Sequence, residues 1–158
     1  MNILILCTGN SARSILLESL LNHLGGGRVT AFSAGSNPAG AVHLQSRALL
    51  TQKGHDTAAA RSKSWDEFEA ADAPVMDAVI TVCSAAAGET CPIWPGAPVR
   101  AHWGVEDPAA TDPKDWVVAF NTAYAILERR ARAFLALPIE TMDAPALKAA
   151  LDETAQIA

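Results

Sequence analysis

The first residues of the chain constrain its fold most. An apolar run from Ile3 to Leu6 passes directly into Cys-Thr-Gly-Asn-Ser-Ala-Arg-Ser at positions 7 to 14. This run predicts a strand from Asn2 to Leu6 that is buried on both faces, as in a parallel sheet. The leucines that follow recur at helical spacing until Gly25, which predicts a helix directly after the loop. The sequence therefore predicts a strand, a short polar loop and a helix.

The loop has the composition of an anion cradle with a nucleophile at its start. Five residues separate Cys7 from Arg13, enough to turn successive N–H groups toward a tetrahedral anion at the positive end of a helix. Arg13 adds a planar fork of donors for two oxyanion oxygens. Gly9 and Asn10 tolerate the left-handed backbone angles that a tight cradle requires. We therefore predict a Cys7 thiolate facing a bound oxyanion.

Every residue after Cys7 in this loop is expected to contribute to anion binding. The expected binding residues are Thr8, Gly9, Asn10, Ser11, Ala12, Arg13 and Ser14. Ser14 is also expected to offer its hydroxyl to the Cys7 sulfur and so to lower its pKa. The alternative is a buried structural cysteine beside a solvated arginine. The preceding strand and the following helix favour the nucleophile loop.

The rest of the chain alternates between strand and helix patterns. Strands are predicted at 29–34, 77–82 and 99–103, and helices at 42–53, from Ser64, at 116–137 and from Asp143. Such alternation implies right-handed crossovers and a parallel sheet. We expect one α/β domain over residues 1–158, with a four-stranded parallel sheet and helices on both faces. Within it, residues 1–138 are the expected core and 139–158 a C-terminal extension with an extra helix.

Two further cysteines follow the third predicted strand. Cys83 ends that strand as Cys7 ends the first, and the carboxyl ends of parallel strands share one edge of a sheet. Cys91 lies in the Gly- and Pro-containing segment 84–98, predicted to be a mobile excursion. The spacing fits neither a Cys-x-x-Cys redox pair nor a zinc knuckle, and a metal site would need His102 as a further ligand. Both cysteines could instead be small buried apolar residues.

An acidic residue follows the fourth predicted strand. Asp107 precedes Pro108, which restricts the backbone and can aim the carboxyl inward as a proton donor for a leaving oxygen. Glu106 is the weaker candidate. The alternative for Asp107 is a turn or helix-cap aspartate.

Composition excludes several classes of function. The net charge of −5 has no basic stripe, which argues against nucleic acid or an anionic membrane as the main partner. No apolar run approaches the ~18 residues of a membrane span, and the start of the chain lacks a signal-peptide pattern. Three cysteines are an odd number, which favours catalytic thiols over a secreted disulfide framework. We expect a cytoplasmic protein.

Four separated blocks resemble the arsenate reductases of the low-molecular-weight protein tyrosine phosphatase fold. The blocks are residues 7–14, Ser33-Ala34-Gly35, residues 79–83 with Cys91-Pro92, and His102-Trp103-Gly104 with Asp107-Pro108-Ala109. The resemblance extends over residues 2 to 137. It implies a phosphotyrosine protein phosphatase I-like fold, beyond which the tail after Pro138 exceeds the family's usual length.

The resemblance implies a thiol relay. Cys7 would attack arsenate, with phosphate or sulfate as mimics of that substrate, while Asp107 protonates the departing oxygen. Cys83 would then attack Cys7 and release arsenite, and Cys91 would form a disulfide with Cys83. Thioredoxin, or glutaredoxin with glutathione, would reopen that disulfide. No cofactor is implied and none of these steps uses a metal, and we expect a monomer.

The sequence departs from the family pattern at some positions. Ala12 stands where many members have a further cysteine, which no step of the relay uses. Some members bind potassium beside the loop, and Lys63 could replace that cation here. The residues that match the potassium pattern are Asn10, Glu18, Ser33 and Asp66.

Two other functions stay open. A tyrosine phosphatase would use Cys7, Arg13 and Asp107 without the later cysteines. Against it, Ile15 stands where such phosphatases have proline, and Ala109 where they have an aromatic residue. The third possibility is a non-catalytic oxyanion-sensing module with the same cradle.

Overall fold

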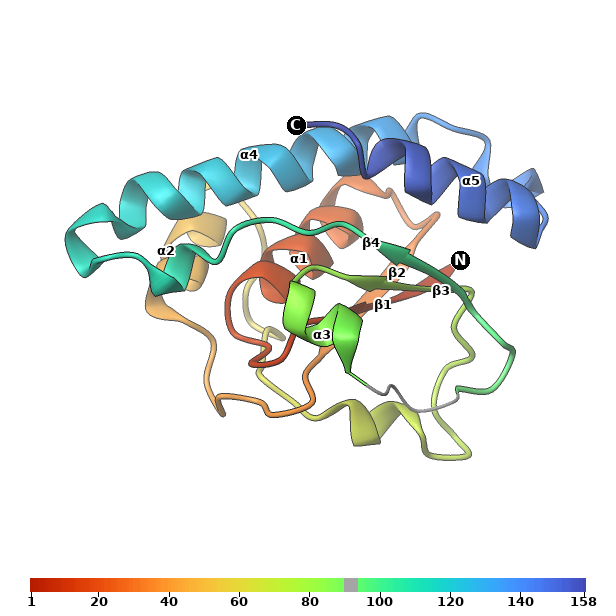
Figure 1. Ribbon diagram of the computed structural model, residues 1–158, viewed down its shortest axis with the longest axis horizontal. Coiled ribbons are helices and arrows are strands. Elements are labelled where there is room, and N and C mark those ends of the chain that lie inside the picture. The colour runs from red at the N-terminus through yellow and green to blue at the C-terminus, as the bar shows by residue number, and fades with distance from the viewer. Residues whose placement is uncertain (90–93) are drawn as a thin grey trace.

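The computed structural model describes residues 1–89 and 94–158. Its centre is a sheet of four parallel strands in the order β2-β1-β3-β4 (Figure 1). The strands are β1 Asn2–Leu6, β2 Thr30–Ala34, β3 Ala78–Thr81 and β4 Val99–His102. The predicted fold class is confirmed, and β1 has the predicted bounds.

Both faces of the sheet are buried, as the continuous apolar runs predict. Ile3 and Ile5 belong to the larger apolar cluster beneath the helices, and Leu4 and Leu6 belong to a smaller cluster on the opposite face. These four side chains are almost completely buried. Because side chains alternate along a strand, β1 contributes to both clusters at once.

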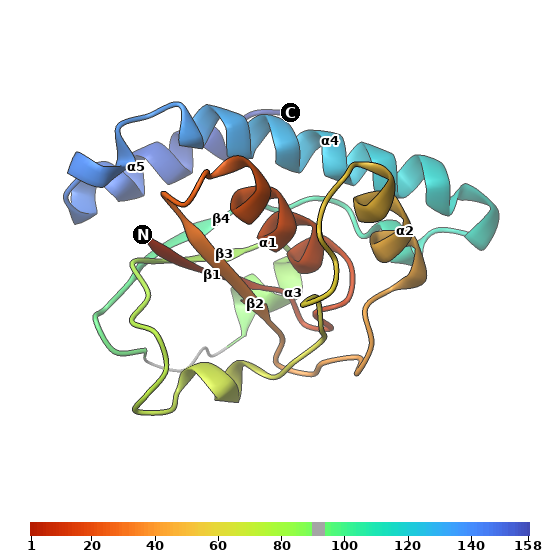
Figure 2. The same ribbon diagram turned by 180° about the vertical axis from the view of Figure 1, so that it is seen from behind.

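The long helices lie on one side of the sheet, with α4 packed over α1 (Figures 1 and 2). They are α1 Arg13–Leu24, α2 Leu44–Gln52, α4 Trp116–Leu135 and α5 Ala144–Thr154. The opposite face is covered by the 3₁₀ helix η1 (Trp65–Phe68) and by the buried Trp94. Helical structure therefore lies on both faces, with only a short element on the second. No helix among the described residues is long and apolar enough to cross a membrane.

The C-terminal helix α5 packs against the edge strand β4 and the core. The indole of Trp103 donates to the carbonyl of Leu151 at 2.9 Å. Arg130 of α4, itself buried, donates to the carbonyls of Ile157 and Gly104. The end of the chain is thereby joined to the segment that leads from β4 toward Asp107.

The segment after Cys83, predicted to be a mobile excursion, begins with a helix that the sequence analysis did not predict. Its first residues form the helix α3, Ser84–Gly88, because the run of three alanines favours helix and the Cys83 sulfur accepts the N–H of Ala86 at 3.3 Å. Residues 90–93 of the predicted excursion, Cys91 among them, lie outside the described residues.

A histidine is buried where the end of α2 meets α1 and α4. His55 contacts the Ser19 hydroxyl through Nδ1 at 2.8 Å and the Tyr124 hydroxyl through Nε2 at 2.9 Å. Its ring stacks on that of His23, with centroids 4.2 Å apart. Burial, and secondly His23, lower the pKa of His55.

This lowered pKa predicts a loss of stability in mild acid. Below about pH 6.5 the unfolded chain binds a proton that folded His55 resists, so the free energy of unfolding falls as pH drops from there toward the lower folded pKa and levels off below it. Denaturant titrations across this range should give a shallower loss for His55→Gln than for wild type. His102→Gln, which changes an exposed histidine, is the control. Equal pH dependence in wild type and His55→Gln would contradict this account.

Candidate active site

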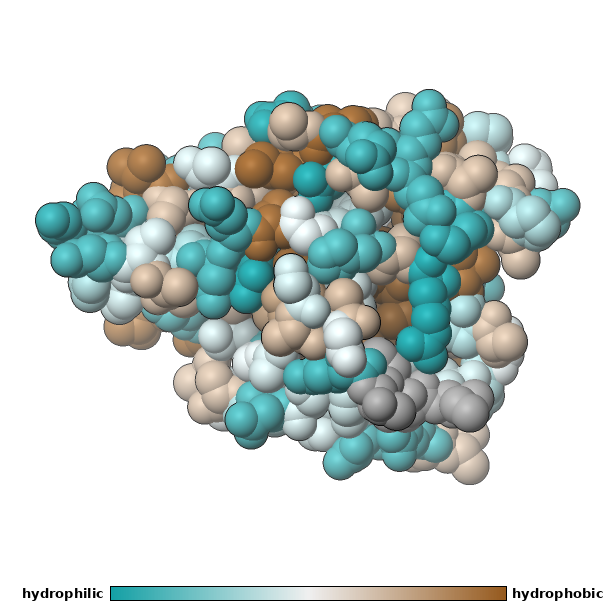
Figure 3. Space-filling model, in the orientation of Figure 1, coloured by the Kyte–Doolittle hydropathy of each residue, from teal (hydrophilic) through white to brown (hydrophobic). Residues whose placement is uncertain are grey.

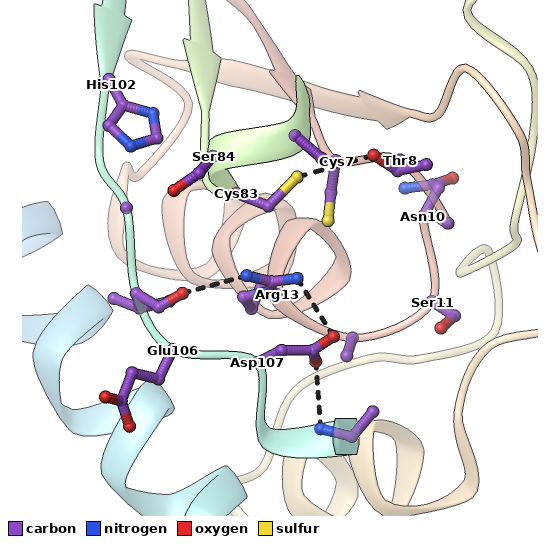
Figure 4. A pocket seen from close by; sticks show the side chains of 16 residues that line it. Cys7, Thr8, Asn10, Ser11, Arg13, Cys83, Ser84, His102, Glu106 and Asp107 are labelled. Carbon is purple, nitrogen blue, oxygen red and sulfur yellow. Dashed lines mark hydrogen bonds and ion pairs between the residues drawn. The ribbon is translucent and has the colours of Figure 1, made fainter. Parts of the chain in front are cut away.

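The loop between β1 and α1 curves around a cavity of about 730 Å³ at the carboxyl ends of the strands (Figure 4). All residues from Cys7 to Arg13 line this cavity, together with Cys83, His102 and Asp107. The structure thus brings together four of the five predicted catalytic residues. The fifth, Cys91, lies outside the described residues. Ser14 does not line the cavity and is fully buried.

The side chain of Asn10 holds the loop in shape from behind. Its amide donates to the hydroxyls of Ser14 and Ser33, both at 2.9 Å, and accepts the N–H of Lys63 at 3.0 Å. Asn10 has a φ of 45°, as predicted, whereas Gly9 does not adopt a positive φ. The Ser14 hydroxyl is engaged by Asn10, which differs from the prediction that it contacts Cys7.

The inner side of the loop presents unpaired donors. The N–H groups of residues 10–14 have no acceptor in the described part of the chain. They belong to the start of α1 and to the loop before it, where unpaired N–H groups and the helix dipole together favour an anion. The loop can therefore hold a tetrahedral oxyanion above the Cys7 sulfur.

Arg13 is oriented by the segment after β4. Its Nη1 donates to the carbonyl of Val105 at 3.0 Å, and its Nη2 lies 3.2 Å from Asp107 Oδ2. Its Nε is buried and has no acceptor among the described residues. A buried donor without a partner is costly. Arg13 has five N–H donors, so these two contacts hold its Nη atoms in place and leave Nε and further Nη hydrogens for an anion.

Asp107 combines the two interpretations that the sequence left open. Its Oδ1 accepts the N–H of Ala109 at 3.0 Å and caps the 3₁₀ helix η2, Pro108–Ala110. Its Oδ2 is the partner of Arg13 and lies at the cavity. The cap fixes the carboxyl while the other oxygen faces the site, which suits a proton donor.

Cys7 and Cys83 form a coupled pair of free thiols. Interaction with Cys7, assisted by the N–H groups of Ala86 and Thr8, lowers the pKa of Cys83 to about 5. Interaction with Cys83, and then burial, raise the pKa of Cys7 and outweigh the lowering by Arg13 and the Gly9 N–H. The pair therefore favours a single negative charge shared between the two sulfurs, because two adjacent thiolates repel each other. The Cys7 thiolate stays a prediction.

Only some of the residues that match the potassium pattern lie in contact with one another. Ser33 donates to the carboxyl of Glu18, and the buried Lys63 ammonium lies 3.9 Å from that carboxyl. Burial lowers the pKa of Lys63 and raises that of Glu18. Asp66 is exposed. Lys63 thus supplies a positive charge beside the loop, where the sequence suggested that it could replace a cation.

Sequence reasoning missed one residue beside the thiols. The Thr8 hydroxyl donates to Glu89 Oε1 at 3.3 Å and lies 3.8 Å from the Cys83 sulfur. Glu89 follows α3 directly. Its position depends on α3, which the prediction for residues 84–98 did not include, although the run of alanines is a local helix signal.

Close packing beneath the loop predicts a strict requirement for Gly35. A Cβ at this position would lie 2.4 Å from the Thr8 carbonyl oxygen and 2.8 Å from that of Cys7. We expect Gly35→Ala to lower the free energy of unfolding by ~1–3 kcal/mol, because the backbone must move. Gly88→Ala is the matched control, since a Cβ there meets no atom within 4 Å. Denaturant unfolding measures both, and equal stability of the two variants would contradict this packing.

The coupled thiols predict an unusual titration. In Cys91→Ser protein, thiolate absorbance in the ultraviolet should rise near pH 5, as the pKa of Cys83 requires. Cys7→Ala removes the main cause of that low pKa and should move the rise to higher pH. Cys83→Ser should abolish the rise near pH 5. Thiolate absorbance in the Cys91→Ser protein that rises only near the ordinary thiol pKa of 9.0 would refute the coupling.

Comparison with known proteins agrees with this geometry. The family model for low molecular weight phosphotyrosine protein phosphatase matches residues 2–148. The arsenate reductase of Halalkalibacterium halodurans is 34% identical over 116 residues, which cover 72% of this chain and 80% of that protein.

Solved structures of arsenate reductases have the same fold. That from Archaeoglobus fulgidus matches with a TM-score of 0.66 and 27% identity, over 85% of this chain and 99% of that one. The thioredoxin-dependent arsenate reductase of Corynebacterium glutamicum matches with a TM-score of 0.61 and 26% identity, over 83% of this chain and 58% of that one. On the matched family model and these similarities, the chain belongs to the low molecular weight phosphotyrosine protein phosphatase family.

Proposed function

We propose that this protein reduces arsenate to arsenite, with Cys7 as the nucleophile and Cys83 as the thiol that resolves the adduct. The observation that carries the proposal is the second free thiol at the same cavity as Cys7. A phosphatase needs only the cradle, Cys7 and an acid. A nearby thiol with a lowered pKa adds the capacity to accept a two-electron oxidation.

The first step forms a bond between Cys7 and arsenic. The unpaired N–H groups of the loop and the Nε of Arg13 hold the arsenate oxygens. The proton of Cys7 passes to the neighbouring Cys83, and the Cys7 thiolate attacks arsenic. An arsenate oxygen departs with a proton from Asp107, whose carboxyl faces the same cavity.

The second step reduces arsenic. Cys83 first loses the proton that it took from Cys7. Its thiolate then attacks the Cys7 sulfur, and the electron pair of the S–As bond passes to arsenic, which leaves as arsenite. Cys91 then attacks Cys83 and frees Cys7, a step that rests on the sequence resemblance alone. A dithiol reductant of the thioredoxin class reopens the final disulfide, which agrees with the name of the Corynebacterium relative. We place the reaction in the cytoplasm, where thiols stay reduced.

Hydrolysis of phosphate monoesters is the second candidate, because family membership and the cradle favour it. It would use Cys7, Arg13 and Asp107 in the same roles. The wall of the cavity near Asp107 carries Ala109 rather than an aromatic side chain, so the site lacks a ring there to clamp a phosphotyrosine. A sensor without catalysis would have no use for two coupled thiols.

Cysteine variants separate these functions. Arsenate-dependent NADPH consumption with thioredoxin and its reductase should fall below ~1% of wild type in Cys7→Ser, Cys83→Ser and Cys91→Ser, because each removes a reacting group. Hydrolysis of p-nitrophenyl phosphate, if present, should be lost only in Cys7→Ser.

Other outcomes would reject particular parts of the proposal. Full turnover by Cys91→Ser would remove the third thiol from the relay. Turnover that requires glutathione and glutaredoxin would change the reductant. Phosphatase activity without arsenate reduction would establish the second candidate instead.

A further inference from the structure

We propose that Glu89 is the acceptor of the proton that Cys83 loses when it attacks Cys7, and that the Thr8 hydroxyl conducts this proton. The role in arsenate reduction rests on the proposed function above. The proton path itself belongs to any reaction in which Cys83 attacks a sulfur bond at Cys7, so it can be tested without arsenate.

The path consists of two contacts to one hydroxyl. Thr8 Oγ1 lies 3.8 Å from the Cys83 sulfur and donates to Glu89 Oε1 at 3.3 Å. A hydroxyl has a single proton, so Thr8 donates to the carboxylate while Cys83 is a thiol, and to Cys83 once it is a thiolate. Both contacts are long, as catalytic hydrogen bonds often are before substrate binds.

Glu89 is held for this task by α3. The helix begins at Cys83, whose sulfur accepts the Ala86 N–H, and ends directly before Glu89. The second carboxyl oxygen of Glu89 is buried and has no partner among the described residues. Unpartnered buried oxygens are few in folded proteins and require a reason. A single short helix thus carries the resolving thiol and the carboxylate linked to it.

The proton balance of the reaction gives a reason for a buried, unpaired carboxyl oxygen on Glu89. The two thiols share one proton in the resting site, and this proton must leave Cys7 for the first attack. If Cys83 takes it, Cys83 must release it again before the second attack. The net transfer is then from Cys83 to Glu89, and a proton from solvent or the dithiol reductant later restores the thiol.

The other titratable groups near the thiols and Glu89 are less suitable acceptors for the Cys83 proton. Arg13 cannot accept a proton, and the Asp107 carboxyl is paired with Arg13 and capped onto η2. Nδ1 of His102 is engaged by the Thr81 hydroxyl at 2.7 Å. On the far side, Glu89 lines a second cavity with Arg100, His102, Lys148 and Asp152, of which Lys148 and Asp152 pair with each other. Of the carboxyls named here, Glu89 has a hydrogen-bonded path to Cys83.

An aromatic disulfide reagent allows the attack of Cys83 on Cys7 to be measured without arsenate. Cys91→Ser protein treated with dithiobis(nitrobenzoate) should form a mixed disulfide at Cys7, releasing one coloured thiolate. The Cys83 thiolate then attacks Cys7, the bond between Cys7 and the aryl sulfur breaks, and a second coloured thiolate leaves. Peptide mapping by mass spectrometry of Cys91→Ser protein, quenched after the first release, shows that Cys7 carries the aryl group, and Cys83→Ser protein, which stops at that adduct, is the reference. The rate of the second release, followed across the pH range in which thiols titrate, measures the attack by Cys83.

We expect Glu89→Gln to slow the second release by ~10-fold or more, because glutamine keeps an acceptor for Thr8 but cannot take up the proton. Thr8→Val should have the same effect and Thr8→Ser should stay near wild type. The slowing should be greatest at low pH, where fewer thiolates form through solvent. Glu69→Gln removes an exposed carboxylate elsewhere and should change nothing.

The sign of the effect separates a relay from simple electrostatics. A carboxylate that acts only by its charge would disfavour the Cys83 thiolate, so its removal would speed the second release. A rate that is unchanged or faster in Glu89→Gln therefore overturns the proposal. The first release serves as a check on folding. Failure of arsenate turnover would reject the proposed function and leave this result intact.

Discussion

The site depends first on a single buried amide. Asn10 ties the loop to α1 through Ser14, to β2 through Ser33 and to the chain at Lys63. Because its side chain satisfies these groups behind the loop, the loop's own N–H groups are left to point the other way. A cradle of unpaired donors is unfavourable by itself. It persists here because the surrounding hydrogen bonds and the close approach of Gly35 to Thr8 restrain the backbone.

The second constraint is electrostatic and lies between two sulfurs. Cys7 sits at the cradle and Cys83 at the start of α3, and their ionisation is shared. An anion entering the loop adds negative charge beside the first thiolate. Transfer of the remaining proton from Cys7 to Cys83 then places the negative charge on Cys7, while the net charge of the two sulfurs stays the same. The site (Figure 4) therefore manages one charge across two thiols instead of creating a permanent thiolate at Cys7.

Sequence patterns predicted the parts of the structure that local chemistry decides. β1 and α1 follow from an apolar run and helical spacing, and the shared edge of parallel strands brings Cys83 to Cys7. Contacts distant in sequence decide other features, because no local pattern pairs Asn10 with Ser33 or Lys63. Of the two residues expected to tolerate a left-handed angle, Asn10 adopts it and Gly9 does not. α3 forms over a local run of alanines, a signal that the Gly and Pro residues of 84–98 outweighed in the prediction.

The same cradle can serve hydrolysis or reduction, and the neighbouring elements decide between them. In hydrolysis, water must reach the adduct on Cys7. In reduction, a second thiol must reach it first. Figure 3 shows hydrophilic and hydrophobic residues mixed on this side of the molecule. Cys83, between β3 and α3, lines the same cavity as Cys7. A thiolate held beside the adduct reacts intramolecularly, with the advantage in effective concentration that such proximity brings. A cysteine just after β3 thus adds thiol–disulfide exchange to an anion-binding fold.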